Sequence, residues 1–150
     1  MPTTGFKDKT DSLTLEHRSF RLPRWLLAQL KRAAERRQTS QTGLVQRYLD
    51  EGLKMDSYPM IVFRDSSFGR RAMLEGTRLD VAQVIETIRN ENGSVEVAAD
   101  YLGLSVAQVQ ACVHYYADNH EAVAAYAARV DEENERLRAV GEREQELLTS

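Results

Sequence analysis

The sequence of 150 residues lacks the features that mark several protein classes. It holds one cysteine, Cys112, so the chain has neither an internal disulfide nor a cysteine-based zinc site. No apolar run approaches the roughly 20 residues that a membrane helix needs, and the first residues have no apolar core of a signal peptide. These absences predict a cytoplasmic protein without a membrane segment, in which residues 1–12 are a flexible leader.

Side chains that carry catalysis are also scarce. The three histidines, His17, His114 and His120, are scattered, and the spacing between the last two puts them on different faces of a helix. The sequence has no H-E-x-x-H motif, no Gly-rich phosphate loop and no nucleophile elbow. We therefore expect a protein that is not an enzyme and that has no metal site and no cofactor.

Positive charge is distributed unevenly along the chain. Residues 1–54 hold 11 Lys and Arg against 6 Asp and Glu, a net charge of +5. Residues 55–150 hold 9 against 17, a net charge of −8. No Lys or Arg lies between Arg89 and Arg129. Halves of opposite sign predict different partners, with a polyanion for the first half.

The basic part, residues 13–54, predicts one strand followed by two helices. Phe20 and Leu22 alternate with polar side chains, which indicates a short strand within residues 13–22. A helix follows from Pro23, and Ser40 is a good N-cap for the second helix. Such a unit has one unpaired strand edge and too little apolar surface for a core of its own. We therefore expect a homodimer or a higher oligomer, in which the strand pairs with its copy.

The acidic part predicts a small domain, residues 55–120, and a charged C-terminal helix or tail, residues 121–150. The domain would contain short strands around residues 61–63 and 71–74 and a helix capped by Asp80. Residues 95–102 and a helix that starts at Ser105 enclose the turn Leu102-Gly103-Leu104, a pattern typical of a helix-turn-helix. In the tail, Gly141 is the only internal helix breaker.

Residues 19–53, SFRLPRWLLAQLKRAAERRQTSQTGLVQRYLDEGL, resemble the ribbon-helix-helix family of prokaryotic repressors and antitoxins. The resemblance implies that two copies pair their strands into a ribbon, which enters the major groove of operator DNA. That groove is about 12 Å wide and shows a distinct pattern of donors and acceptors for each base pair. With Phe20 and Leu22 on the core face, the residues that face the bases would be His17, Ser19 and Arg21, of which Arg21 suits guanine.

The same resemblance places a phosphate contact at the start of the second helix. There, free backbone N–H groups and the hydroxyls of Ser40 and Thr42 would hold a phosphate oxygen. Two residues depart from the family pattern: Trp25 replaces a residue that is usually polar, and Arg18 falls on the face expected to be apolar. Arg18 leaves the register of the strand open, since a slip by one residue exchanges the two faces.

EGTRLDVAQVIE and YLGLSVAQVQACVHYYADN, which lie within residues 71–119, resemble an uncharacterised helix-turn-helix-like domain family. That family recurs in antitoxins that accompany PIN-like nuclease toxins, so the chain as a whole looks like a VapB-type antitoxin. The fold class implied is mainly α with short β. It consists of a ribbon-helix-helix dimer, a small helix-turn-helix-like helical domain and a C-terminal helix or tail.

The helix-turn-helix-like domain has little charge with which to bind DNA. Non-specific affinity for DNA needs several Lys or Arg on the docking face, whereas its second helix offers only Gln108, Gln110 and His114 as outward polar groups. The favoured interpretation is packing, with direct DNA reading as the alternative. Four apolar residues at helical spacing would form a stripe that belongs to the core or to a dimer surface: Val106, Val109, Val113 and Tyr116. Tyr115 beside this stripe would complete a patch that faces a partner.

The resemblance also implies that the tail binds the nuclease toxin. PIN-type toxins hold metal in a cluster of carboxylates, which an arginine can occupy because guanidinium matches carboxylate. The predicted toxin-binding residues are the apolar anchors Val123, Tyr126 and Val130 on one helical face and the arginines Arg129, Arg136 and Arg138, with Arg143 as a further candidate. A solvated charged helix is the alternative interpretation of this segment.

These expectations together predict an antitoxin of a type II toxin–antitoxin system. It would neutralise a PIN-like nuclease and repress its own operon by binding operator DNA. The alternative is a free-standing ribbon-helix-helix transcriptional regulator whose second domain senses a ligand or oligomerises.

Overall fold

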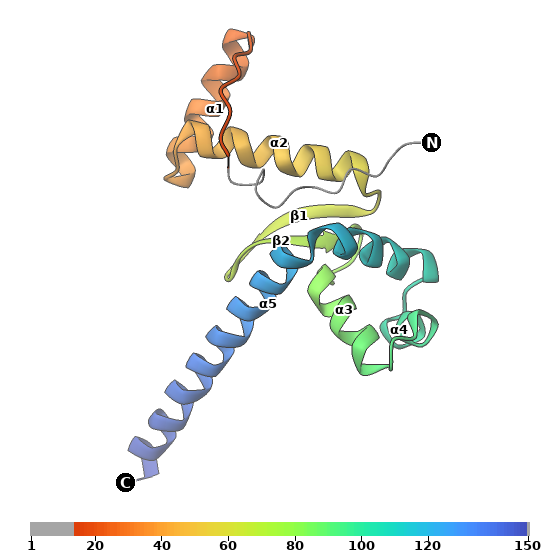
Figure 1. Cartoon of the computed structure of the whole chain (residues 1–150). Coiled ribbons are helices and arrows are strands. Elements are labelled where there is room, and N and C mark those ends of the chain that lie inside the picture. Colours follow the sequence, from red (N-terminus) through yellow and green to blue (C-terminus); the bar gives the residue numbers. More distant parts are fainter. Residues whose placement is uncertain (1–13, 150) are drawn as a thin grey trace. The chain divides into compact units, whose positions relative to one another are not determined.

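The computed structural model describes residues 14–149, so the expected leader, residues 1–12, lies outside the described residues. This part of the chain is mainly helical, with five helices and one two-stranded antiparallel hairpin (Figure 1). It divides into two compact units, Met1–Val45 and Gln46–Ser150, which we describe one at a time.

The first unit is built on two helices. Helix α1, Arg24–Arg37, follows Pro23 directly and ends at Gln38, which adopts a left-handed conformation with φ 52°. Helix α2, Gln41–Ser57, starts after Ser40 and continues into the second unit. The Ser40 Oγ accepts a hydrogen bond from the Gly43 N–H at 3.0 Å, so the predicted N-cap is confirmed.

Residues 14–23 form neither helix nor strand in the single chain. The strand expected within residues 13–22 is therefore absent from the described part of that segment. The physical reason is that a strand needs a neighbour for its N–H and C=O groups, and the neighbour expected here is a second copy of the chain. The intermolecular ribbon thus stays a prediction.

The second unit begins with the end of α2 and a hairpin. Strand β1, Ile61–Ser66, pairs with strand β2, Gly69–Leu74, in a register that runs from Ile61 opposite Leu74 to Ser66 opposite Gly69. The Ser66 hydroxyl closes the turn by donating to the Gly69 carbonyl at 2.7 Å, and Gly69 tolerates its φ of +108° because it has no Cβ. Both predicted strands are confirmed, and each is longer than expected.

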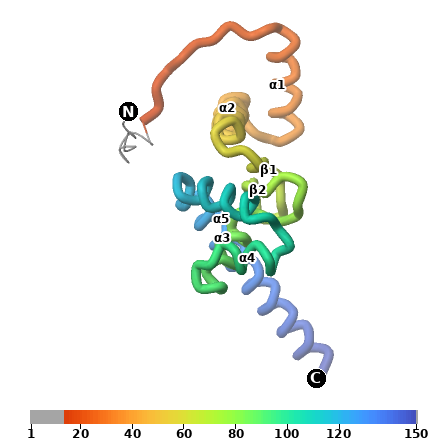
Figure 2. Tube along the Cα trace, turned by 90° about the vertical axis from the view of Figure 1, so that its right-hand side faces the viewer, coloured from red at the N-terminus to blue at the C-terminus, as the bar shows by residue number. Residues whose placement is uncertain are grey.

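Three helices complete this unit and pack against one another, and two of them, α3 and α5, also pack against the hairpin (Figures 1 and 2). Helix α3, Val81–Asn90, starts with a capping box in which Asp80 and Gln83 each accept a hydrogen bond from the other's N–H. Helix α4, Val95–Leu102, ends at Gly103 with φ +66°, and Ser105 caps helix α5, Val106–Thr149. The predicted caps and turn are confirmed.

Helix α5 is longer than expected. Its 44 residues join the predicted second helix of the helix-turn-helix to the predicted tail, with one departure from helical geometry at Asn119 (φ −127°, ψ 24°). The Asn119 side chain donates a hydrogen bond to the Tyr115 carbonyl at 2.9 Å. This bond satisfies a backbone acceptor close to the irregular residue. Gly141 does not break the helix, because a glycine in a helix costs only about 1 kcal/mol.

The core of the second unit is apolar and lies between the hairpin and the helices. Its buried members are Ile61, Phe63, Leu74, Val81, Val84, Ile85, Ala99, Val109, Cys112, Tyr115 and Val123. Cys112 is buried as expected, and burial raises the pKa of its thiol to about 12. Over residues 14–149, no helix is both long enough and apolar enough to cross a membrane.

Candidate functional site

The residues predicted to read DNA lie on an exposed segment. His17, Ser19 and Arg21 are all exposed in the irregular chain before α1, so nothing in their own unit covers them. Ser40 uses its Oγ as the acceptor that caps α2. Its hydroxyl hydrogen stays available for a phosphate oxygen beside the exposed Thr42.

Large apolar side chains are also exposed in the first unit. Phe20 is 76% exposed and Trp25 is 61% exposed, and Leu22 and Leu27 are more than two fifths exposed. Among the described residues of this unit, 14–45, the buried side chains are those of Ala34 and Leu44. An apolar surface of this kind is typical of an interaction surface.

The predicted recognition helix is the first part of α5, and a capping box occupies its start. Ser105 and Gln108 form a capping box, in which each side chain accepts a hydrogen bond from the other's backbone N–H. Gln110 and His114 instead line a shallow cavity of about 320 Å³ beside Tyr58. No Lys or Arg lies on this helix before Arg129, so the packing interpretation remains favoured over DNA reading.

Tyr115 is buried, in contrast to the partner-facing position expected for it. Its ring makes edge contacts with Tyr58, at 5.3 Å between centroids, and with Phe63, at 6.2 Å. Val109 and Cys112 are buried on the same helix, whereas Val106 is exposed. The apolar side of α5 is thus a core surface. It includes Tyr115, which the predicted stripe left outside the core.

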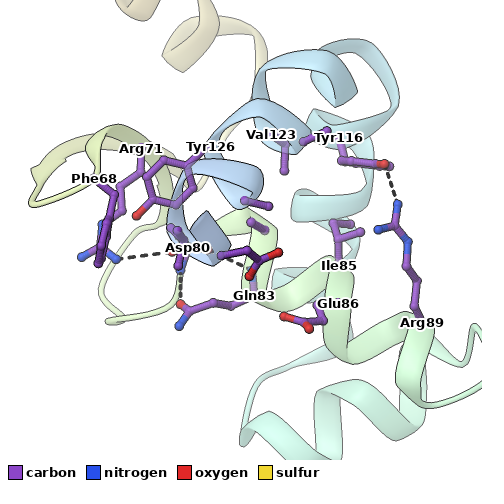
Figure 3. A pocket seen from close by; sticks show the side chains of 15 residues that line it. Phe68, Arg71, Asp80, Gln83, Ile85, Glu86, Arg89, Tyr116, Val123 and Tyr126 are labelled. Atoms are coloured by element: carbon purple, nitrogen blue, oxygen red, sulfur yellow. Dashed lines mark hydrogen bonds and ion pairs between the residues drawn. The ribbon is translucent and has the colours of Figure 1, made fainter. Parts of the chain in front are cut away.

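A cavity of about 370 Å³ lies between α3 and the middle of α5 (Figure 3). Ile85, Tyr116 and Val123 contribute apolar walls. Both arginines at its edge have partners within the unit. The Arg71 Nη1 lies 3.3 Å from the Asp80 Oδ2, and the Arg89 Nη2 donates a hydrogen bond to the Tyr116 hydroxyl at 2.6 Å. An apolar cavity with a charged edge suits an apolar side chain or a small ligand.

The first predicted toxin anchors belong to this domain. Val123 is 7% exposed and Tyr126 is 6% exposed, and the Tyr126 hydroxyl lies 3.2 Å from the Ser66 hydroxyl. Arg129 donates from its Nε to the Phe68 carbonyl at 3.2 Å, and Val130 lines the cavity of Figure 3. Val123 and Tyr126 therefore pack α5 against the rest of its unit, whereas Arg129 is exposed and Val130 is half-buried.

The remaining predicted arginines lie further along α5. Arg136 forms an ion pair with Glu133, and the Arg143 Nε donates to the Ala139 carbonyl at 3.3 Å. Arg138 is exposed. None of residues 131–149 is buried, and this end of α5 extends past the other elements of its unit (Figure 2).

One polar cluster escaped the sequence analysis. Glu51, on α2, accepts hydrogen bonds from the Nε and the Nη2 of Arg70, on β2, at 2.6 and 2.8 Å. Arg70 also contacts Asp65 across the hairpin at 3.3 Å. The sequence gives only one hint of this cluster, since Glu51 interrupts an apolar helix face. Nothing in the sequence indicates that its partner is Arg70, 19 residues away. Among residues 14–149, no group of His, Cys, Asp and Glu could hold a metal ion.

Comparison with known protein families identifies part of this unit. Residues 61–116 match the family model described as "Protein of unknown function (DUF433)". The chain therefore contains a DUF433 domain, which covers the hairpin, α3, α4 and the first part of α5. The expected likeness of residues 71–119 to an uncharacterised domain family is confirmed to that extent. Neither curated proteins nor solved structures gave a match.

Proposed function

We propose that this protein is an antitoxin of a type II toxin–antitoxin system, which binds and neutralises a PIN-like nuclease and represses its own operon. The observation that supports this most is the free end of α5. None of residues 131–149 is buried, and they hold seven Asp or Glu against three Arg. Such a helix suits a basic groove, and the surface of a nuclease that binds nucleic acid is expected to be basic.

The toxin contact would start later in the chain than the first apolar anchors predicted from the sequence. Since Val123 and Tyr126 are buried in the domain, the apolar contact would come from Leu137, Val140 and Leu147, whose spacing places them along one face of α5. Leu137 and Leu147 are exposed. This face would lie in the groove of the nuclease.

Arg138 is the arginine best suited to the carboxylate cluster of the nuclease. It is exposed, and it forms no hydrogen bond or ion pair with any of residues 14–149. Arg136 is paired with Glu133 and would have to leave that carboxylate first. The Arg138 guanidinium, next to the apolar anchor Leu137, would reach the carboxylates without first breaking an ion pair.

Binding of operator DNA would be the task of the first unit. The exposed Arg21 and the exposed apolar residues around it support this part of the proposal. A second copy of the chain would cover the apolar surface and supply the second strand of the ribbon. The DUF433 domain would then link the DNA-binding unit to the toxin-binding helix.

Co-expression with a PIN-like nuclease, to be sought among the products of the neighbouring genes, tests the proposal. The full chain should restore growth and co-purify with the nuclease. A chain that ends at Asp131 keeps the buried Val123 and Tyr126 and should therefore stay folded, as measured by circular dichroism, yet restore no growth. Arg138→Gln should weaken rescue, and Arg64→Gln, at an exposed position of β1 outside the free end of α5, is its matched control.

Two outcomes would count against the proposal. Rescue by the chain that ends at Asp131 would place the toxin site upstream of the free helix. Failure of the full chain to bind the adjacent nuclease would favour the alternative, a free-standing transcriptional regulator.

A further inference from the structure

A second cavity of the DUF433-containing unit is lined by arginines that have buried N–H groups without an acceptor among residues 14–149. Its volume is about 240 Å³, and its walls come from the end of α2, the hairpin and α5. Four cationic side chains line it, from Arg47, Lys54, Arg70 and Arg71, against the two carboxylates of Asp50 and Glu51. The lining is therefore richer in positive than in negative groups.

The carboxylates of this cavity are already engaged. Both oxygens of Glu51 accept hydrogen bonds from Arg70, and Asp50 accepts one from the Lys54 Nζ at 2.8 Å. The Arg47 Nε lies 3.9 Å from the nearest Glu51 oxygen, which is an ion-pair distance but too long for a hydrogen bond. Arg47 thus has a carboxylate nearby, but its Nε and Nη2 have no hydrogen-bond acceptor within residues 14–149.

Two arginines have buried donors without an acceptor. The Nε and Nη2 of Arg47 and the Nε of Arg71 are buried and form no hydrogen bond among residues 14–149. Buried polar groups are hydrogen-bonded in the great majority of cases, and an exception calls for an explanation such as a ligand. Each guanidinium has a carboxylate within ion-pair distance, Asp80 for Arg71 and Glu51 for Arg47. What these side chains lack is an acceptor for the buried N–H groups, which costs free energy when it stays unmade.

The surroundings of these donors would strengthen a bond to an anion. Phe63, Val81, Tyr115 and Val123 supply apolar surface to the cavity, which lowers the local dielectric and increases the attraction between opposite charges. A guanidinium group presents its donors in a planar fork that fits two oxygens of a carboxylate or a phosphate. Arg47 and Arg71 belong to different elements, α2 and β2, so one oxyanion could bridge them.

We propose that this cavity binds a small molecule through an oxyanion, a phosphate or a carboxylate group, held by Arg47 and Arg71. The site lies outside the DNA-binding segment and outside the free end of α5, and it depends on neither part of the proposed function. A bound oxyanion would connect the C-terminal half of α2 to the hairpin. Binding of this kind stabilises the folded state by an amount that grows with the logarithm of the ligand concentration above Kd.

Isothermal titration of the full chain with inorganic phosphate, and separately with succinate, tests the proposal. Ionic strength is held constant with sodium chloride, which also measures non-specific anion effects. We expect saturable 1:1 binding of at least one of the two probes. Binding of phosphate alone would identify a phosphate-bearing ligand, and binding of succinate alone a carboxylate-bearing one.

Matched variants assign the binding to the two arginines. Arg47→Gln and Arg71→Gln should each weaken the affinity roughly tenfold to a hundredfold, as expected for the loss of a charge-assisted hydrogen bond. Arg64→Gln removes the same charge from β1 outside the cavity lining and should leave the affinity unchanged. Binding that persists in Arg47→Gln, or that Arg64→Gln weakens equally, would overturn the assignment.

A measurement on the wild-type chain covers the case in which a variant does not fold. In spectra of the ¹⁵N-labelled chain, the Nε–H signals of Arg47 and Arg71 should shift on addition of the probe, whereas that of Arg64 should not. The absence of both saturable heat and selective shifts with phosphate and with succinate would refute the site.

Discussion

Replacement of Glu51 by alanine should destabilise the second unit strongly. The Glu51 residue is 7% exposed, and its carboxylate accepts two short hydrogen bonds from Arg70 and attracts Arg47. The variant would leave both guanidinium groups without this carboxylate. Removal of one partner of a buried ion pair costs about 3–5 kcal/mol. Because the Arg70 side chain is 28% exposed and water can solvate part of it, we expect a loss of about 2–3 kcal/mol.

A surface pair on the same helix supplies the control for this prediction. Asp50 accepts a hydrogen bond from Lys54 at 2.8 Å, but its side chain is 58% exposed. Asp50→Ala should therefore cost only about 0.3–0.5 kcal/mol. The free energies of unfolding come from urea titrations followed by circular dichroism, at one fixed protein concentration because oligomers unfold in a concentration-dependent way.

A double-mutant cycle with Arg70→Ala isolates the interaction itself. The coupling energy between Glu51 and Arg70 should be on the order of 1–3 kcal/mol. A loss below about 1 kcal/mol for Glu51→Ala, equal to that of Asp50→Ala, would refute the reasoning. It would mean that water solvates this cluster as it solvates a surface pair.

Three further predictions concern single side chains. Burial raises the pKa of Tyr115 to about 12 from its ordinary value of 10.0, so the unfolded chain ionises first. The free energy of unfolding should fall by about 2–3 kcal/mol between pH 10 and pH 12, and Tyr115→Phe should reduce that fall. With a pKa raised to about 12 by burial, Cys112 should resist iodoacetamide at pH 8 in the folded chain and react in urea; reaction of the native thiol would contradict its burial. Arg21→Ala should weaken binding to the promoter DNA of its own operon by roughly 1–3 kcal/mol and leave nuclease binding intact, and an unchanged gel-shift titration at fixed salt would remove Arg21 from the reading face.

The starts of the helices and the end of α4 could be predicted from the sequence because their signals are local. Asp80, Ser94 and Ser105 each bond a backbone N–H three residues ahead, and such a cap depends only on neighbouring residues. Gly103 likewise ends α4 through its own backbone conformation. The two strands of the hairpin could also be predicted, since the turn that joins them lies between them in the sequence.

The sites were harder to predict because they depend on which surfaces meet. Periodicity showed that Val123 and Tyr126 share an apolar face, but the same face would suit a partner or the chain's own core. The charged cluster is a stronger case, since Glu51 and Arg70 lie 19 residues apart on a helix and a strand. No local rule connects two such positions.

The sequence alone thus determined the helices, their caps, the hairpin, the buried Cys112 and the opposite charges of the two halves, since each depends on near neighbours or on composition. Only the tertiary structure decided that α5 continues from the domain into the tail, and that Val123 and Tyr126 are buried. It also decided that Arg47 and Arg71 share a cavity. These outcomes depend on how the elements pack, because burial and pairing are properties of two surfaces and a sequence pattern describes only one of them.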